Sequence, residues 1–278
     1  MAKGKMKRAF TLIELVVAIA ILAMVLSFAG VIFKVSIGAF RTGIANAEIM
    51  RKLRAITDQL NTDFKSVGKG MPIVVFPDRI VFLANGDFQT IRQYEYGPPS
   101  AGTKKTVAGN LASIFYGITD ITIGKDEEGN DILGEPILSR GQMILTSDDS
   151  LLQDPPILEL GEYCQMSFYE FRAECQNIFG SKETWAGGSL PALDPTSEED
   201  LVRYMAKGVS DFRVYFADWV GGKFTWQQGN GTFVDAEHAI RFDKKPGTRA
   251  LKFSFTLYDS MGIIKNGRRF THIVYIGD

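Results

Sequence analysis

The stretch KMKRAFTLIELVVAIAILAMVLSFAGVIF, Lys5 to Phe33, decides how the chain folds. Its apolar part runs from Phe10 to Phe33 and contains one charged residue, Glu14. About 20 apolar residues suffice for a helix to cross a bilayer, so this run predicts a transmembrane helix. Only basic charges precede the run, and this asymmetry predicts a cytoplasmic N-terminus. The run is too long for the core of a secretory signal, and no small-x-small cleavage site closes it.

Glu14 is the unusual residue of this stretch. A carboxylate at the centre of a membrane helix costs about 2.5 to 3.5 kcal/mol on insertion scales. Two interpretations follow. Either Glu14 lies close to the membrane surface and its side chain extends to the membrane–water interface, or another chain supplies a positively charged partner for it.

The residues around the start of the apolar run, Lys7-Arg8-Ala9-Phe10-Thr11-Leu12-Ile13-Glu14, resemble the signal of type IV pilins and type II secretion pseudopilins. The resemblance covers about the first 30 residues. It implies that a prepilin peptidase cuts between Ala9 and Phe10 and methylates the new amine of Phe10. The family usually has Gly before the cut, where this chain has Ala9. Glu14 becomes the fifth mature residue, and the resemblance implies that it pairs with the methylated amine of an adjacent subunit during assembly.

Composition is that of a globular protein, with 45% apolar and 23% charged residues and a net charge of −1. Removing the leader takes away four basic residues and makes the mature chain more acidic. A chain without a basic excess gives no reason to expect nucleic acid as a partner. We therefore expect membrane lipid before assembly, and other major and minor pseudopilins, a prepilin peptidase and an inner-membrane assembly platform as partners.

Four segments follow from these patterns. Residues 1–9 are the leader peptide, 10–33 the transmembrane part of the N-terminal helix, 34–71 its amphipathic continuation and 72–278 a β-rich periplasmic domain. The last is long enough for a sizeable hydrophobic core. The chain should thus be a single-pass inner-membrane protein with a cytoplasmic N-terminus.

The helix should continue beyond Phe33, because no Pro occurs before Pro72. At 1.5 Å per residue, a helix from Phe10 to Val67 would span about 85 Å. Most of its charged residues, Asp63 among them, are expected to lie off the apolar stripe, and Gly68, Gly70 and Pro72 to end the helix. Steps of three and four residues define the stripe: Phe40, Ile44, Ala47, Met50, Leu53, Ile56, Leu60, Phe64 and Val67.

From Ile73 the apolar period becomes two, which is typical of strands. Asn85-Gly86 predicts a two-residue hairpin turn between strands Arg79–Ala84 and Phe88–Tyr96. Further short strands are expected near Ile114, Ile121, Ile132 and Met143, and a strand or strand pair over Leu160–Arg172.

The acidic run Asp126–Asp131 separates two of these strands and predicts a solvated hairpin turn. A Ca²⁺ loop is the alternative, since hard cations bind several oxygen ligands. The position of its Gly does not fit the EF-hand pattern. Residues 181–195 are loop-like, and Thr196-Ser197-Glu198-Glu199 predicts the start of a helix that runs to Lys207 and ends at Gly208.

The last third of the chain has the clearest strand pattern. Alternating apolar residues predict an antiparallel meander with one buried face. His272 alternates with these residues, so a hydrogen-bonded core histidine is expected, and His238 should lie on a loop. This tail is similar to the C-terminal region of J-type minor pseudopilins, with W-type minor pilins as near neighbours. The alternating residues are Phe212, Val214 and Phe216; Leu251, Phe253, Phe255 and Leu257; Phe270, Val274 and Ile276.

Cys164 and Cys175 are the two cysteines. Export would place both outside the cytoplasm, where disulfides persist. They either form a bridge or remain two buried reduced thiols. Two His and two Cys without ligand spacing predict no zinc site.

No motif for catalysis is present. The chain lacks G-x-x-x-x-G-K-[ST] and G-x-S-x-G, so neither a P-loop ATPase nor an α/β-hydrolase elbow is expected. We expect no enzyme activity and no cofactor. A membrane-tethered hydrolase is the alternative that activity of the purified domain would reveal.

The sequence therefore predicts an α+β protein with a long N-terminal helix packed on antiparallel sheet, a pilin-like fold. The resemblance implies a minor pseudopilin of a type II secretion system, a tip or assembly-initiating subunit that helps export folded proteins across the outer membrane. The alternative is a minor type IV pilin that acts in pilus assembly, adhesion or DNA uptake.

Overall fold

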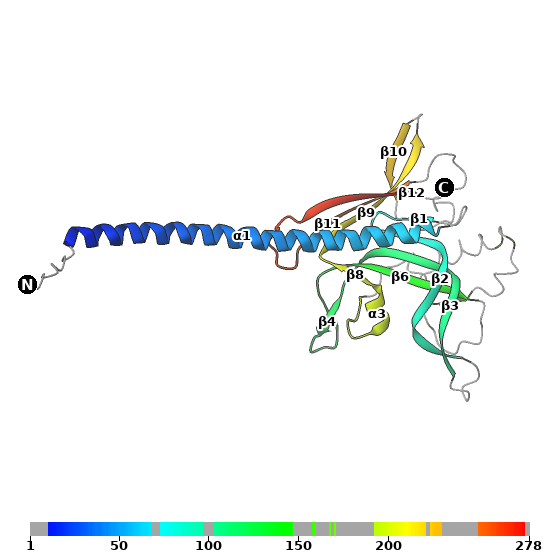
Figure 1. Ribbon diagram of the computed structural model, residues 1–278. Coiled ribbons are helices and arrows are strands. Elements are labelled where there is room, and N and C mark those ends of the chain that lie inside the picture. The colour runs from blue at the N-terminus through cyan, green and yellow to red at the C-terminus, as the bar shows by residue number, and fades with distance from the viewer. Residues whose placement is uncertain are drawn as a thin grey trace, which may run out of the picture.

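The computed structural model describes residues 11–67, 73–96, 103–146, 157–159, 167, 170, 192–220, 223–229 and 250–275. One long helix runs out of a β-rich domain (Figure 1). The described elements are α1 Leu12–Lys65, β1 Ile73–Val75, β2 Arg79–Tyr96, β3 Thr103–Thr119, β4 Thr122–Lys125, β5 Asp131–Leu133, β6 Ile137–Thr146, β7 Ile157–Glu159, α3 Glu198–Arg203, β8 Tyr204–Lys207, β9 Val209–Val220, β10 Lys223–Gln228, β11 Ala250–Leu257 and β12 Arg268–Tyr275.

Two sheets flank the second half of α1. The first has the order β1-β2-β3-β6-β7, with β8 also paired to β6, and its pairs are antiparallel except β6 with β7. The second is antiparallel with the order β10-β9-β11-β12. In Figure 1 the second sheet lies above the helix and much of the first lies below it. The expected α+β architecture of a long helix on antiparallel sheet is confirmed.

The core is built where α1 meets both sheets. The ring of Phe64 stacks on Phe82 of β2 with 4.2 Å between ring centroids, and lies 5.6 Å from Phe253 of β11. Leu60 and Ile56, about one and two turns before Phe64, are fully buried. One face of the helix thus supplies the contact between two separate sheets.

The predicted apolar stripe coincides with the buried face of α1 over the last three turns. Before them the prediction is wrong, because other residues are buried. Phe40 is 70% exposed, and Ile44 and Met50 are each 40% exposed. Ala47 is exposed as well. Ala45 and Ile49 are buried instead. The domain covers α1 only from about Ala45 onward, and the positions of the two sheets, not the apolar pattern alone, select the buried face.

Asn85-Gly86 does not form a hairpin turn, so that prediction is wrong. Both residues lie inside β2, which stays paired with β3 on either side of them. The register shifts between Asn85 and Phe88, and the Asn85 amide donates to the Ser66 carbonyl at 2.8 Å. The extra residue is accommodated as a bulge because β3 is long enough to pair with both halves of β2.

The helix predicted to reach Lys207 ends four residues earlier. α3 ends at Arg203, and Tyr204–Lys207 form β8, which pairs with β6. Ser197, not Thr196, caps α3 by accepting a hydrogen bond from the Asp200 amide. Pairing with a buried strand thus overrides the local helical tendency.

Several other predictions are confirmed. Residues Asp126–Asn130 form the turn of the β4–β5 hairpin. The alternating residues of the last third lie in β9, β11 and β12, with their apolar side chains in or against the core. Ile276, His238, Cys164, Cys175 and nearly all of residues 160–191 lie outside the described residues.

Phe64→Ala should reduce the free energy of unfolding by about 3 to 5 kcal/mol, the usual cost of removing a buried Phe. Phe40→Ala, on the exposed part of the same helix, is the matched control and should change it by less than about 0.5 kcal/mol. Urea unfolding of the full chain in detergent, followed by Trp fluorescence, measures both. Equal losses for the two variants would contradict the described packing.

Candidate assembly and anchoring site

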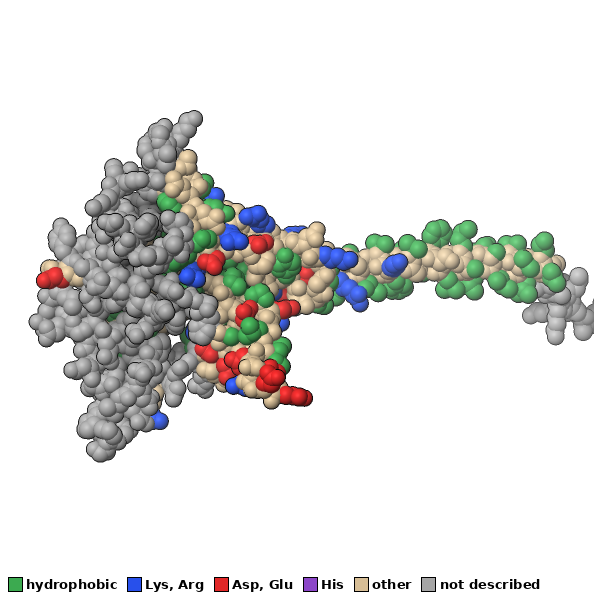
Figure 2. All heavy atoms as spheres, turned by 180° about the vertical axis from the view of Figure 1, so that it is seen from behind, with side chains coloured by type: hydrophobic (Ala, Val, Ile, Leu, Met, Phe, Trp, Pro, Cys, Tyr) green, Lys and Arg blue, Asp and Glu red, His purple; other side chains and the backbone are tan. Residues whose placement is uncertain are grey.

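The first half of α1 is an exposed apolar surface. Its large apolar side chains from Leu12 to Phe40 are each more than half exposed. Figure 2 shows hydrophobic side chains along both edges of the projecting helix. Within the described residues this is the one helix long and apolar enough to cross a membrane, and none of its most apolar window is buried. A helix that is apolar all round needs lipid or other helices as surroundings.

Thr11 and Glu14 form a capping box at the start of α1. The Thr11 amide and hydroxyl both donate to Glu14 Oε2 at 2.9 Å. The Glu14 amide donates to Thr11 Oγ1 at 3.4 Å. The pattern T-x-x-E is a known start signal for helices, and it was the signal in the sequence that could have predicted this contact.

The capping box bears on the role of Glu14. Both hydrogen bonds to the carboxylate use Oε2, and within the described part of the chain no residue donates to Oε1. Glu14 thus stabilises its own helix and keeps one carboxylate oxygen for a further donor. Ala9 and Phe10, the predicted processing residues, lie outside the described residues, as does any contact they make with Glu14.

Asp63 anchors the other end of α1 inside the domain, contrary to its predicted position off the buried face. Arg140 of β6 binds it with two hydrogen bonds, Nε to Oδ2 at 2.7 Å and Nη2 to Oδ1 at 2.9 Å. The Tyr116 hydroxyl of β3 also donates to Oδ2, and Gln59 Nε2 donates to Oδ1 at 3.0 Å. Only 5% of Asp63 is exposed. Every contact that a buried carboxylate needs is therefore supplied.

Burial and the contacts with Asp63 shift the pKa values of Tyr116 and Arg140. Burial raises the pKa of Tyr116 well above its ordinary value, and the negative charge of Asp63 raises it further. Burial opposes the charge of Arg140, but the hydrogen bonds and charge of Asp63 outweigh it and raise the Arg140 pKa. Tyr116 thus stays a neutral donor, and Arg140 stays a cation, at any physiological pH.

A second polar contact holds α1 about four turns earlier. Glu48 accepts from the Ser260 amide at 3.1 Å and the Ser260 hydroxyl at 2.9 Å. Lys52 pairs with Glu48 at 2.8 Å and donates to the Tyr258 carbonyl at 2.9 Å. Burial opposes ionisation of Glu48, but the bonds from Lys52 and Ser260 outweigh it and lower its pKa. The loop between β11 and β12 is thereby fixed to the helix.

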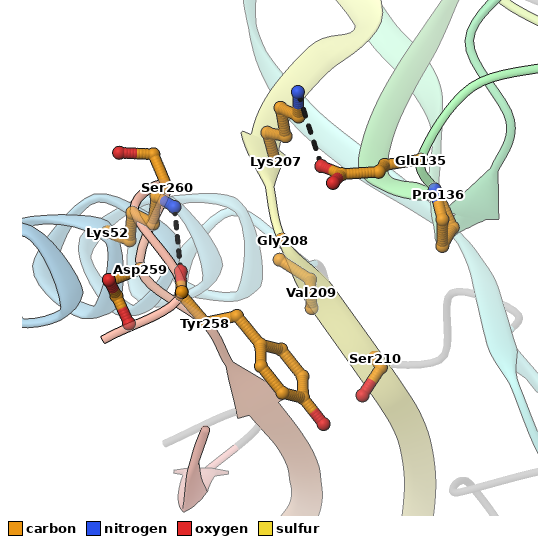
Figure 3. A pocket seen from close by; sticks show the side chains of 11 residues that line it. Lys52, Glu135, Pro136, Lys207, Gly208, Val209, Ser210, Tyr258, Asp259 and Ser260 are labelled. Atoms are coloured by element: carbon orange, nitrogen blue, oxygen red, sulfur yellow. Dashed lines mark hydrogen bonds and ion pairs between the residues drawn. The ribbon is translucent and has the colours of Figure 1, made fainter. Parts of the chain in front are cut away.

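A pocket of about 430 Å³ opens beside this contact. Figure 3 shows it between α1 and the β8–β9 junction, with Lys52 bonded to Tyr258 on one side and Lys207 bonded to Glu135 on the other. Lys207 Nζ lies 3.2 Å from Glu135 Oε2, and more than half of each side chain is exposed. Ser210 and Ser260 line the pocket, but no His or Cys does. Lys52, Lys207, Glu135 and Asp259 line it as well, and each of them already binds another group of the chain.

His272 is the hydrogen-bonded histidine that the sequence predicted. Its Nε2 lies 2.9 Å from Asn61 Oδ1 of α1. Burial lowers its pKa below the ordinary value. The imidazole therefore joins β12 to α1 as a neutral group. Among the described residues, no group of three or more His, Cys, Asp or Glu side chains could hold a metal ion.

Residues 4–30 match the model of the prokaryotic N-terminal methylation motif. This motif is the type IV pilin-like signal, and it implies processing by a prepilin peptidase and assembly with pilin-like subunits. The match covers this N-terminal signal alone, which is of the kind found in type IV pilins and pseudopilins. No curated protein and no solved structure matches the chain significantly.

Asp63→Leu should destabilise the chain by about 3 to 5 kcal/mol, because it leaves Arg140 buried without its partner. Arg140→Met should cost a similar amount by stranding Asp63. The double variant should cost less than the sum of the two, since neither charge is then left alone. A double-mutant cycle from urea unfolding tests this, and strictly additive losses would show that the two charges are not coupled.

Proposed function

We propose that the chain is a minor pseudopilin of a type II secretion system, a tip or assembly-initiating subunit of the pseudopilus that helps to export folded proteins across the outer membrane. The observation that carries the proposal is the methylation motif at residues 4–30, which continues into an exposed apolar helix whose second half packs in a β-rich domain. The proposed location is the inner membrane, with the domain in the periplasm before assembly. The proposed role is structural, without enzyme activity.

The helix supports this role because it has two possible surroundings. In the membrane, lipid tails solvate the side chains from Leu12 to Phe40, and in an assembled bundle similar helices cover them. Moving the helix between the two surroundings exposes little apolar surface to water. Withdrawing it from the bilayer still needs work from a separate ATPase, so partner proteins are obligatory.

Glu14 is the proposed assembly residue. Its Oε1 is free to accept a hydrogen bond from a donor outside the described chain, while Oε2 stays in the capping box. We infer that the methylated amine of a neighbouring Phe10 fills this position. Inside an apolar bundle the attraction between the two charges is far stronger than in water. Such a pair would set the axial position of each incoming subunit.

The mature chain should begin at Phe10 and carry an N-methyl group. Intact-mass analysis of protein purified from membranes, with sequencing of the N-terminal peptide, measures both features. Ala9→Gly provides a comparison, since Gly is the usual residue of the family at this position, and it should be cut at least as completely. A mature chain that starts at Met1, or beyond Phe33, would contradict the assignment of the signal.

Glu14→Ala should leave membrane insertion and cleavage intact but reduce crosslinking to partner pseudopilins and secretion of a reporter protein by tenfold or more, since one buried ion pair is lost. Thr11→Ala is the matched control, because it removes the hydroxyl that accepts from the Glu14 amide and keeps the carboxylate. It should cost only about 1 kcal/mol of helix stability and preserve assembly.

Equal defects in Glu14→Ala and Thr11→Ala would reduce the role of Glu14 to helix capping. Crosslinking should be sampled during assembly as well as at steady state, because a tip subunit uses this contact while it is inserted. Co-purification with subunits of a retractable pilus, in place of secretion pseudopilins, would reassign the chain to a minor type IV pilin.

A further inference from the structure

The four-stranded sheet presents a basic and aromatic outer face, defined by Arg213, Tyr215, Trp226, Lys252, Arg269 and Ile273. The strand register places Tyr215, Lys252 and Ile273 in one row across β9, β11 and β12. Paired residues point to the same side of a sheet, opposite to Val214 and Phe253, which lie in the core. This row therefore faces away from α1.

Lys252 is held in the middle of this face by two aromatic rings. Its ammonium lies 4.4 Å from the ring centre of Tyr215 and 4.8 Å from that of Trp226. Arg269 Nε donates to Ser254 Oγ at 3.1 Å. In the register of β9 and β11, Arg213 lies opposite the same Ser254. Within the described residues, none of these three cations has a carboxylate partner. The face thus carries positive charge that the described part of the chain does not neutralise.

Apolar surface lies beside these cations. Trp226 is 39% exposed, Ile273 is 40% exposed, and Tyr275, two residues further along the same side of β12, is 76% exposed. Trp, Tyr and Arg are the residue types that most often dominate binding energy at protein interfaces. The composition of this face therefore favours a protein partner that is both acidic and apolar.

The β4–β5 hairpin of the same chain has the complementary chemistry. Its turn carries Asp126, Glu127 and Glu128, all exposed. Its strands expose Ile123 and Leu133, by 66% and 53%. The hairpin forms a separate two-stranded sheet, and an isolated hairpin of this size gains little stability by itself. The hairpin thus offers acidic and apolar side chains together to a partner surface.

The two surfaces lie on different sides of the same molecule. Figure 1 shows β4 below α1 and the four-stranded sheet above it, and Figure 2 shows Asp and Glu side chains gathered on the lower part of the domain. One copy therefore has its hairpin and its basic face on opposite sides of the helix. A second copy, displaced along a common axis, can join one surface to the other.

We propose that the β4–β5 hairpin of one copy of this chain docks on the basic and aromatic outer face of the four-stranded sheet of a second copy. Such a contact is heterologous, because it joins two different surfaces, and a pair of copies joined in this way leaves one hairpin and one sheet face unoccupied. The inference rests on the proposed function, because the two copies meet in the assembly that this function requires. It adds that more than one copy of the chain takes part.

The test uses the full chain in its native membrane, with a benzophenone side chain in place of Ile123. Irradiation should yield a covalent dimer, and mass spectrometry should locate the adduct in β9, β10, β11 or β12 of the second copy. Reversing the charges on the hairpin (Glu127→Lys with Glu128→Lys), or on the sheet (Arg213→Glu with Lys252→Glu), should lower the dimer yield at least about tenfold, because like charges then face each other.

Co-expression supplies the decisive comparison. A hairpin-reversed chain that carries the benzophenone should recover its adduct when the sheet-reversed chain is present, since opposite charges face each other again. Asp87→Lys, an exposed acidic residue on β2, is the control and should leave the yield unchanged. Thermal unfolding of each variant verifies that it folds.

Three outcomes overturn the proposal: an adduct outside the four-stranded sheet, an adduct to a different polypeptide, or a yield that neither reversal changes. Any of them, together with a methylated Phe10 and a defective Glu14→Ala variant, rejects the hairpin contact while the proposed function stands. A chain that remains unprocessed but gives the charge-dependent dimer rejects the proposed function and keeps the contact.

Discussion

The contact of Ile56, Leu60 and Phe64 with two sheets at once is the constraint on which the domain depends. Each sheet turns an apolar face toward the helix, and neither of these faces can be left in water. The helix covers both because Phe64 reaches Phe82 on one side and Phe253 on the other. The polar contacts of Asp63 and Glu48 then fix its position along and around its axis, which apolar packing alone leaves loosely determined.

Much of this fold could be predicted from the sequence where a period extends over many residues. The helix from Leu12 to Lys65 follows from an uninterrupted chain without Pro, and β11 follows from the alternation of Leu251, Phe253, Phe255 and Leu257. The methylation motif is also a local pattern, and the family model matches it at residues 4–30. Cleavage between Ala9 and Phe10 stays a prediction. These features depend on residues that are neighbours in the sequence.

The features that could not be predicted depend on contacts between distant residues. Asp63 looks like a surface residue until Arg140, 77 positions later, is placed beside it. Asn85-Gly86 has the composition of a tight turn, but the length of β3 makes it a bulge. Tyr204–Lys207 continues a helical pattern, but pairing with β6 makes it a strand. In each case the partner element decides, and a local pattern carries no information about it.

The two polar anchors on α1 also determine how the protein would carry mechanical load. Glu48 and Asp63 are 15 residues apart, about 22 Å along a helix, and they bind different sheets. A pull along the axis of α1 would therefore be shared between the sheets and would load both anchors in shear. Hydrogen bonds loaded in shear must break together and not one by one. The part of α1 between Glu48 and Asp63 would then move together with the domain, so that a displacement of this part of the helix is passed to both sheets at once.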